Sequence, residues 1–548
     1  MVVTLWRTLF TKRLSSQAGK LPPDEELNKM RGTEYNGNMK PAVDFIEDLL
    51  GVNDDLVIRS LRVFTHYDAV LIYFSNLVNR EVINDSIVKP LMNTANYQAG
   101  KKPKRQDIQE LISKDIVFFG QIHWENNIPQ AVEALLRGDT LVFMDDVDKI
   151  LCISTRNVEH RGIEQPQTEQ AVRGSRDGFI ESMATNITLL RYRLQTPNFR
   201  IKMQTLGRLS KTKVGICYIE GIVNPALVEE VERRLNSIDV DVILDAGTIE
   251  QYVEDNHWSP FPQLENSERP DKCVSNLCEG RVVLLIDGTP FALIAPAVFT
   301  QFYQTVDDYS ERPLMGSLIR MVRVVALLFS LVFPGIYVAV ISFNPELIPT
   351  QFAVAIAGAR AGVPFPAVVE VLIMEISMEV LREATLRLPQ QVGGALSIVG
   401  VLVIGQAAVA AGFVSPITVV IIALTTIGSF ATPAYNAAVA MRILRFLITI
   451  LGGIFGLYGV VIGMIVITNH MLSLRSFGVP YMSPIVPVEW QGWKDALMRA
   501  PIWWMPVRPQ QVHPQNNRRL GKGTLEKVFQ RPHHPLDPVD PKGDRQKS

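Results

Sequence analysis

Hydrophobic and charged positions are unevenly distributed along this chain of 548 residues. Charged side chains crowd the first 320 residues and the last 50, whereas the stretch from Gln391 to Met441 contains no Asp, Glu, Lys or Arg. Uncharged runs of about 20 residues are long enough to cross a lipid bilayer as helices. The pattern therefore predicts a membrane protein with a large soluble head.

The uncharged runs divide into candidate membrane spans. Val324–Phe343 holds 20 residues without a charge, and Pro334 inside this run predicts a bend. The block 391–441 is long enough for two spans, divided near residues 412–416, and Phe446–Thr468 gives another span of 23 residues. Two pairs of glycines in this last run predict close helix packing, although glycine is also simply common in such helices. These candidate packing residues are Gly452, Gly456, Gly459 and Gly463.

A further hydrophobic segment, Ala367–Leu386, carries a row of carboxylates. At about 100° per residue, Glu375, Glu379 and Glu383 fall within an arc of about 80° on one helix face, and Glu370 points elsewhere. A row of carboxylates lining a pore would attract cations. The sequence therefore predicts either an ion pathway along this face or a helix on the membrane surface, with Arg382 neutralising part of the row. No nucleophile or metal ligand accompanies the row, so a catalytic carboxylate pair is not expected.

Arginines near the ends of the spans bear on orientation, because cytoplasmic loops are enriched in Lys and Arg. All of them can be cytoplasmic only if Ala367–Leu386 or its neighbour crosses the membrane once. Five crossings would then place the basic C-terminal tail outside, and a re-entrant segment or a sixth crossing would remove this conflict. The arginines concerned are Arg320, Arg323, Arg382, Arg387, Arg442 and Arg445.

The polar first half of the chain contains an internal repeat. The stretch "AVLIYFSNLVNREVINDSIVKPL" from Ala69 matches "KVGICYIEGIVNPALVEEVERRL" from Lys213, with Tyr73 aligned to Tyr218. Each copy predicts a buried strand, an Asn-containing turn and an amphipathic helix capped by Asn79 or Asn224. "DTLVFMDDVDKILCIST" predicts two strands joined by a tight acidic turn. The head is therefore expected to be α/β, with two small subdomains built on mixed sheets.

The stretch "GRVVLLIDGTPFALIAPAVF", residues 280–299, changes character halfway. Its first apolar run predicts another buried strand, which Asp287-Gly288 ends as a turn. Pro290 is expected to prevent the ladder from continuing, and the second run, Phe291–Phe299, is too short to span a bilayer. We therefore expect this second run to lead the chain from the head onto the membrane surface.

Composition excludes several classes of function. The net charge of −1 gives no reason to expect nucleic acid as a partner. Cys273 and Cys278 lack metal-site spacing, and the four cysteines are expected to be reduced. The arginine-dense stretch Glu164–Leu194 lacks a phosphate-loop pattern and is expected to form ion pairs. Arg7 and Lys12 interrupt the apolar N-terminal stretch, so neither a signal peptide nor export of the head is expected.

Several short motifs together resemble one family. They are "EGRVVLLIDGTPFALIAPAVF", "SPFPQLENSERPD", "NPELIPT", "GVPFPAVVE", "SIVGVLVIGQAAVAAGFVSP" and "LRSFGVPYMSP", which occur in this order between about Asp44 and Val488. They resemble the GerA-type spore germinant receptor A subunits, a family that includes stage V sporulation protein AF. One departure is Arg360-Ala361-Gly362, where family members commonly have Arg-Glu-Gly, so any role of that glutamate is absent here.

The resemblance implies a multi-pass protein of the spore inner membrane with its head on the spore-core (cytoplasmic) side. It implies assembly with germinant receptor B and C subunits and with membrane lipid, as a homo-oligomer, possibly a pentamer. The implied activity is a nutrient-gated cation channel that starts germination, without a cofactor, a metal site or an enzymatic step. The alternatives are an amplifier of germination like stage V sporulation protein AF, or a membrane scaffold that does not conduct ions.

These expectations divide the chain into five parts. A flexible arm comprises residues 1–40, the first α/β subdomain residues 41–155, and a helical segment with the second α/β subdomain residues 156–305. An all-α transmembrane domain follows in residues 306–488, and residues 489–548 form a basic, proline-rich tail.

Overall fold

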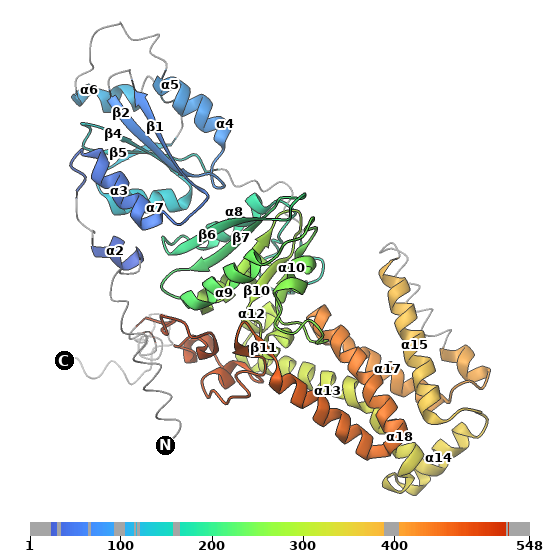
Figure 1. Ribbon diagram of the computed structural model, residues 1–548. Coiled ribbons are helices and arrows are strands. Elements are labelled where there is room, and N and C mark those ends of the chain that lie inside the picture. Colours follow the sequence, from blue (N-terminus) through green and yellow to red (C-terminus); the bar gives the residue numbers. More distant parts are fainter. Residues whose placement is uncertain are drawn as a thin grey trace, which may run out of the picture. The chain divides into compact units, whose positions relative to one another are not determined.

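The computed structural model describes residues 23–29, 34–63, 67–92, 105–113, 117, 121–156, 165–387, 405–521 and 524. The chain forms two compact units, each described below by itself (Figure 1). The head unit comprises Met1–Gln170, Arg176–Val253 and Asn266–Ala295. The helical unit comprises Ala171–Ser175, Glu254–Glu265 and Pro296–Ser548.

The head unit contains two five-stranded sheets, each packed against helices. The first sheet has the order β1-β2-β4-β5-β3, and α3 and α7 pack on it over a continuous hydrophobic core. The predicted acidic hairpin is confirmed, because β4 and β5 pair across the turn that contains Asp146. The elements are α2 Pro23–Lys29, α3 Met39–Leu50, β1 Leu56–Val63, β2 Tyr67–Phe74, α6 Arg105–Leu111, β3 Ile122–Glu125, α7 Ile128–Arg137, β4 Thr140–Met144 and β5 Ile150–Ile153.

The second sheet has the order β6-β7-β9-β10-β8, with α8 and α11 packed together against it. All four pairings of the first sheet are antiparallel, so the prediction of a mixed sheet is wrong there. In the second sheet the pairings of β6 with β7, β7 with β9 and β9 with β10 are antiparallel as well. The elements are α8 Met183–Arg193, β6 Phe199–Leu206, β7 Thr212–Ile219, α9 Pro225–Asn236, α10 Ala246–Val253, β8 Glu265–Ser267, α11 Pro270–Glu279, β9 Val282–Ile286 and β10 Ala292–Ala295.

The internal repeat corresponds to a strand followed by a capped helix in each copy. The Asn79 side chain accepts hydrogen bonds from two backbone amides after β2, and Asn224 does the same for Ala226 after β7. Both predicted helix caps are therefore confirmed. The first copy differs in its helix, which is divided into α4 Arg80–Ile83, a π-helical turn Asn84–Val88 and α5 Lys89–Met92.

The stretch 280–299 corrects one prediction. β9 is the expected buried strand, but the following apolar run forms β10, which pairs antiparallel with it, with Leu293 opposite Leu284. Pro290 lies in the connecting turn, where no ladder hydrogen bond is needed, and therefore does not end the sheet. Residues 291–295 thus complete the sheet of the head, and the predicted junction to the membrane is wrong for them.

Arg191 is the best-buried member of the arginine-dense stretch. Its guanidinium donates to both carboxylate oxygens of Asp55 at 2.6 Å and to Asn53 at 2.9 Å. Because Asp55 precedes β1 and Arg191 lies on α8, this ion pair ties the two subdomains of the head together. Here the predicted intradomain ion pair is confirmed.

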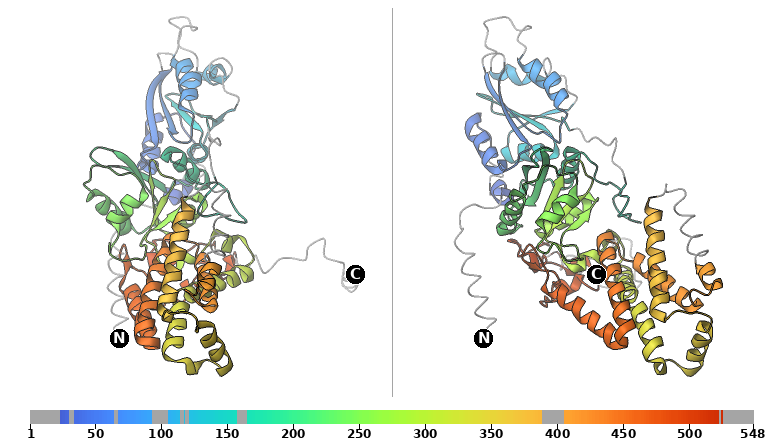
Figure 2. Two further views of the ribbon diagram at one scale, coloured as in Figure 1. Left: turned by 90° about the vertical axis from the view of Figure 1, so that its right-hand side faces the viewer. Right: turned by 45° about the vertical axis from the view of Figure 1, so that its right-hand side comes forward.

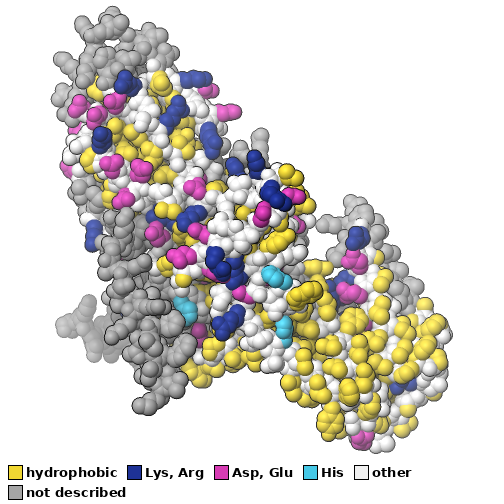
Figure 3. Space-filling view, viewed as in Figure 1, with side chains coloured by type: hydrophobic (Ala, Val, Ile, Leu, Met, Phe, Trp, Pro, Cys, Tyr) yellow, Lys and Arg dark blue, Asp and Glu magenta, His cyan; other side chains and the backbone are white. Residues whose placement is uncertain are grey.

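The helical unit is built around α13, which contacts α15, α17 and α18; Figure 2 shows these helices side by side in both views. By length and composition, α13 and α18 are long and apolar enough to cross a membrane, and α18 is divided by non-helical dihedrals at Gly456. Hydrophobic side chains cover much of this unit's surface in the view of Figure 3. Its elements are η3 Phe299–Tyr303, α12 Val306–Ser310, α13 Pro313–Phe343, η4 Pro345–Leu347, α14 Thr350–Arg360, α15 Ala367–Leu386, α17 Pro416–Phe430, α18 Tyr435–Ser473, β11 Arg475–Ser476, β12 Val479–Pro480, η5 Gly492–Asp495, η6 Ile502–Trp504 and η7 Gln510–Val512.

Candidate membrane ion-pair site

Residue contacts fix the directions of the helices around α15. Tyr337 of α13 meets Thr418 of α17, and Ser330 lies against Gly428, so α17 runs antiparallel to α13. Val368 of α15 meets Gly453 of α18, and Glu375 meets Arg445, so α15 runs antiparallel to the first part of α18. The acidic face of α15 is therefore turned toward other helices of the same unit.

Glu370, which helix periodicity places off the acidic face, is the most highly connected carboxylate of α15. It is fully buried, and one oxygen accepts the Arg360 guanidinium at 3.0 Å. The other oxygen accepts the Ser415 backbone amide at 2.9 Å and the Thr418 hydroxyl at 3.0 Å. Glu370 thereby links the end of α14 and the start of α15 to the start of α17. Helix periodicity alone gives no sign of this role, because the partners lie in other segments.

Glu375 is buried in an ion pair with Arg445. The Arg445 Nε lies 3.0 Å from a carboxylate oxygen, and the side chains of Arg445 and Glu375 are 3% and 0% exposed. Gly335 of α13 faces Ile448, one turn of helix from Arg445, so the pair lies level with the middle of the uncharged run 324–343. A pair at this depth must be compensated locally, because an unpaired charge there is costly.

Glu379 is shared by two arginines, and Glu383 has one. One oxygen of the Glu379 carboxylate accepts a hydrogen bond from the Arg382 guanidinium at 2.9 Å. The Arg442 Nε lies 3.3 Å from the other oxygen. Glu383 pairs with Arg387 at 2.6 Å, where both side chains are exposed. Within the described residues each glutamate of the row has an arginine partner, so the row is electrically compensated in this conformation.

The arginines on α18 change the orientation argument. The sequence pattern assigns Arg442 and Arg445 to a cytoplasmic loop, but both are buried against α15. Arg320 and Arg323 before the first span are likewise buried in ion pairs. These four arginines therefore cannot serve as loop markers in the positive-inside rule.

α18 is two helices joined at Gly456, which has the non-helical dihedrals φ 64° and ψ −145°. Beyond it the chain runs back along itself: Gly459 lies against Leu451, and Gly463 lies against Ile448. Gly452 lies against the Gly335 carbonyl of α13, where an added Cβ would come within 2.7 Å. The single predicted span Phe446–Thr468 is therefore wrong, because the chain reverses in its middle.

The turn at Gly456 gives a first testable prediction. Gly456→Ala is expected to lower the free energy of unfolding by about 1–3 kcal/mol, because these dihedrals are adopted almost solely by glycine. The new Cβ would also lie 3.1 Å from Phe343. Thermal unfolding of the purified full-length protein in detergent measures the effect. The control is Gly358→Ala in α14, where an added Cβ meets nothing within 4 Å; equal effects of the two changes would contradict the strained turn.

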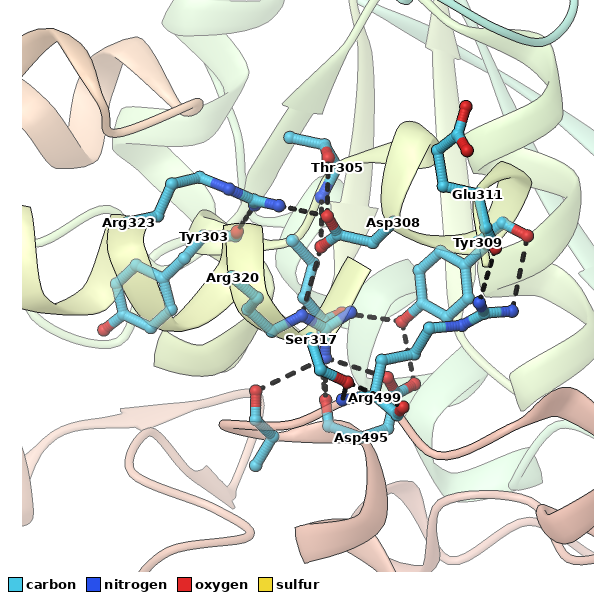
Figure 4. Close-up of polar contacts among 12 residues, drawn as sticks. Tyr303, Thr305, Asp308, Tyr309, Glu311, Ser317, Arg320, Arg323, Asp495 and Arg499 are labelled. Atoms are coloured by element: carbon cyan, nitrogen blue, oxygen red, sulfur yellow. Dashed lines mark hydrogen bonds and ion pairs between the residues drawn. The ribbon is translucent and has the colours of Figure 1, made fainter. Parts of the chain in front are cut away.

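A second buried cluster lies at the start of α13 (Figure 4). Asp308 of α12 accepts hydrogen bonds from Arg323 and from the Arg320 Nε at 3.1 Å. Arg320 also donates hydrogen bonds to Asp495, to its carboxylate at 2.9 Å and to its carbonyl oxygen at 2.6 Å. Tyr309 donates to the same carboxylate at 2.7 Å. The cluster therefore joins the start of α13 to a segment 175 residues later in the chain.

Further contacts place the two ends of the helical bundle in one layer. The Phe299 amide donates to the Tyr481 carbonyl at 2.8 Å, and Ser317 exchanges hydrogen bonds with the backbone of Arg499. The residues before α13 and those after α18 consequently pack on each other. If the bundle crosses a membrane, both ends lie on the same side, and the number of crossings is even.

None of the four cysteines forms a disulfide. Burial raises the pKa values of the Cys152 and Cys217 thiols well above their ordinary range. A thiol held protonated in an apolar environment is a poor nucleophile and a poor metal ligand. Among the residues that the structure describes, no group of three or more His, Cys, Asp or Glu side chains is placed to hold a metal ion.

An α/β head followed by helices long and apolar enough to cross a membrane is typical of a membrane-associated protein. The profile of the Bacillus/Clostridium GerA spore germination protein family matches residues 44–511, and the chain belongs to this family. The family consists of germinant receptor subunits and is not known as an enzyme family, and membership supports a role in spore germination.

Individual relatives cover most of the chain. Spore germination protein KA of Bacillus subtilis (strain 168) is 44% identical, covering 86% of each chain. Spore germination protein GerLA of Bacillus cereus is 38% identical, covering 88% of this chain and 97% of its own. Stage V sporulation protein AF of Bacillus subtilis (strain 168) is 31% identical, covering 76% and 84%.

A solved structure matches part of the chain. It is the crystal structure of the N-terminal domain of the A subunit of the Bacillus megaterium spore germinant receptor GerK3. It is 32% identical, covers 49% of this chain and 98% of its own, and has a TM-score of 0.39.

Proposed function

We propose that the protein is the A subunit of a spore germinant receptor and forms, as a homo-oligomer with B and C subunits, a nutrient-gated cation pathway in the spore inner membrane. Support comes from the family and from the higher identity to protein KA, 44%, than to stage V sporulation protein AF, 31%. The head is proposed to lie on the spore-core side.

The proposed membrane topology has an even number of crossings. Five of them are α13, α15, α17 and the two halves of α18. α13 and the first half of α18 run in one direction, and α15, α17 and the second half of α18 run in the other. A Cβ added at Gly412 would lie 3.4 Å from the Gly362 carbonyl oxygen near the start of α15, so the chain has returned to that end before α17 begins. This return accounts for the two bundle ends lying in one layer.

The observation that carries the mechanism is the buried pair Glu375–Arg445. In the described conformation each glutamate of the row is paired with an arginine, and Glu375 is buried away from solvent. We propose that a nutrient signal moves α15 relative to α18, so that Glu375 and Glu379 exchange their arginine partners for water and cations. In this proposal the ion pairs of Glu375 and Glu379 with arginines stabilise the closed state.

Potassium release tests this proposal. Spores carrying Glu375→Gln with Glu379→Gln are compared with wild-type spores after addition of a nutrient mixture that germinates the wild type, and the protein level is checked by blot. We expect release per molecule of protein, corrected for the abundance on the blot, to change about tenfold or more, since tenfold requires only about 1.4 kcal/mol of barrier. The control is Glu383→Gln, whose exposed pair with Arg387 should matter little.

Unchanged release in the double variant would remove the α15 row from the ion path. It would favour the second candidate, a non-conducting scaffold. The pairing of every glutamate of the row with an arginine also favours a scaffold. An amplifier like stage V sporulation protein AF is distinguished by genetics: its loss would slow germination by every nutrient, whereas loss of a receptor subunit would abolish the response to particular nutrients.

A further inference from the structure

The segment Val486–Trp504 after α18 is rich in exposed aromatic and apolar side chains. Four of the seven tryptophans of the chain lie between residues 490 and 504. Trp490 is 81% exposed, and Trp493 is the least exposed of the four. The exposed apolar residues of the segment are Val486, Val488, Trp490, Met498, Ile502, Trp503 and Trp504.

The segment is firmly held by its polar side chains, which point inward. Asp495 binds Arg320 and Tyr309, and its carbonyl accepts the Gln304 side-chain amide at 2.7 Å. Arg499 is buried, and its guanidinium donates to the carbonyl oxygens of Glu311 and Tyr309. The charges of Asp495 and Arg499 thus face the protein while indole rings face outward, which is the reverse of the arrangement expected in water.

The depth of the segment follows from its anchors. Ser317 and Arg320 lie one to two helix turns before the uncharged run that begins at Val324. At about 1.5 Å per residue, the anchors are about 6–10 Å from the start of the proposed hydrocarbon span. This distance corresponds to the headgroup layer, where tryptophan is enriched because its ring is apolar and its N–H is polar.

We propose that Val486–Trp504 lies in the interfacial layer of the lipid bilayer and anchors the helical bundle there. The indole rings pack among the glycerol and upper acyl groups, and the exposed Lys494 faces lipid phosphates. The proposal rests on the membrane insertion of the bundle proposed above. The occupant is lipid rather than a second copy, because the outward side chains combine indoles and a cation at the level of the headgroups.

Quenching of tryptophan fluorescence by brominated lipids tests the proposal on the full-length protein in phosphatidylcholine–phosphatidylglycerol vesicles. We expect strong quenching by lipids brominated near the headgroup end of the acyl chain, and weaker quenching by lipids brominated near its methyl end. Trp490→Phe, Trp503→Phe and Trp504→Phe together should remove most of this quenching. Trp490→Phe alone is a milder second variant, and the control Trp124→Phe in β3 of the head should leave the quenching unchanged.

The outcomes separate this proposal from the membrane insertion on which it rests. Vesicle-bound protein whose quenching survives the triple change would overturn the interfacial anchor alone. The anchor is also overturned if bromolipids never quench the wild type because a second copy covers the rings. Protein that fails to float with the vesicles would overturn both the anchor and the spanning bundle.

Discussion

Arg445→Gln is expected to be one of the most destabilising single substitutions in the helical unit. It leaves the Glu375 carboxylate fully buried without its 3.0 Å partner. Removing one member of a buried ion pair costs about 3–5 kcal/mol, because the remaining charge keeps its desolvation penalty and loses its compensation. We therefore expect a large drop in the thermal unfolding temperature of the detergent-purified protein and a reduced protein level in spores.

The double variant Glu375→Gln with Arg445→Gln is expected to recover most of this loss. Two neutral amides of similar size can occupy the same space without an uncompensated charge. The matched control is Arg387→Gln, whose partner Glu383 is 60% exposed, and for which about 0–1 kcal/mol is expected. A double variant as unstable as the sum of the two single changes would show that Glu375 and Arg445 are not coupled.

The structure also indicates which features could be predicted from local sequence and which could not. The capped strand–helix repeats and the acidic hairpin were predictable, because their signals lie within a few residues of each other. The pairing of Glu379 with Arg382 was likewise within reach, since both lie on one helix face. The pairing of Glu375 with Arg445 could not be predicted, because nothing in a single sequence relates two residues that are 70 positions apart.

Two of the errors in the fold have a common physical origin. Pro290 and Gly456 each allow more than one backbone outcome, and tertiary contacts decide between them. A proline can end a strand or occupy a hairpin turn, and here Pro290 lies in the turn between β9 and β10. A glycine can allow a straight helix to pack closely on another, or it can adopt a turn that reverses the chain. Gly456 adopts the turn, and the contacts of Gly459 and Gly463 stabilise the reversal. Hydropathy is identical for both alternatives, so it could not choose between them.

The second large effect is expected from Asp308→Asn. Asp308 is 2% exposed and compensates two buried arginines at once, Arg320 and Arg323. The amide keeps the shape but removes the negative charge, so Arg323 is left with the Tyr303 carbonyl and Arg320 with Asp495. We expect a loss of about 3–5 kcal/mol in the free energy of unfolding, measured by thermal unfolding in detergent.

This substitution should also loosen the C-terminal segment, because Arg320 links Asp308 to Asp495. Limited proteolysis of the full-length protein is expected to cut within residues 485–505 faster in Asp308→Asn than in wild type. Glu311→Gln is the matched control, since its carboxylate points away from the cluster in Figure 4. Equal cutting rates in the Asp308→Asn variant and this control would mean that the segment is held by its backbone contacts. A selective increase would assign the coupling between the start of α13 and the aromatic segment to the shared arginine. In the proposed channel, a movement of α13 would then be transmitted to the proposed interfacial anchor.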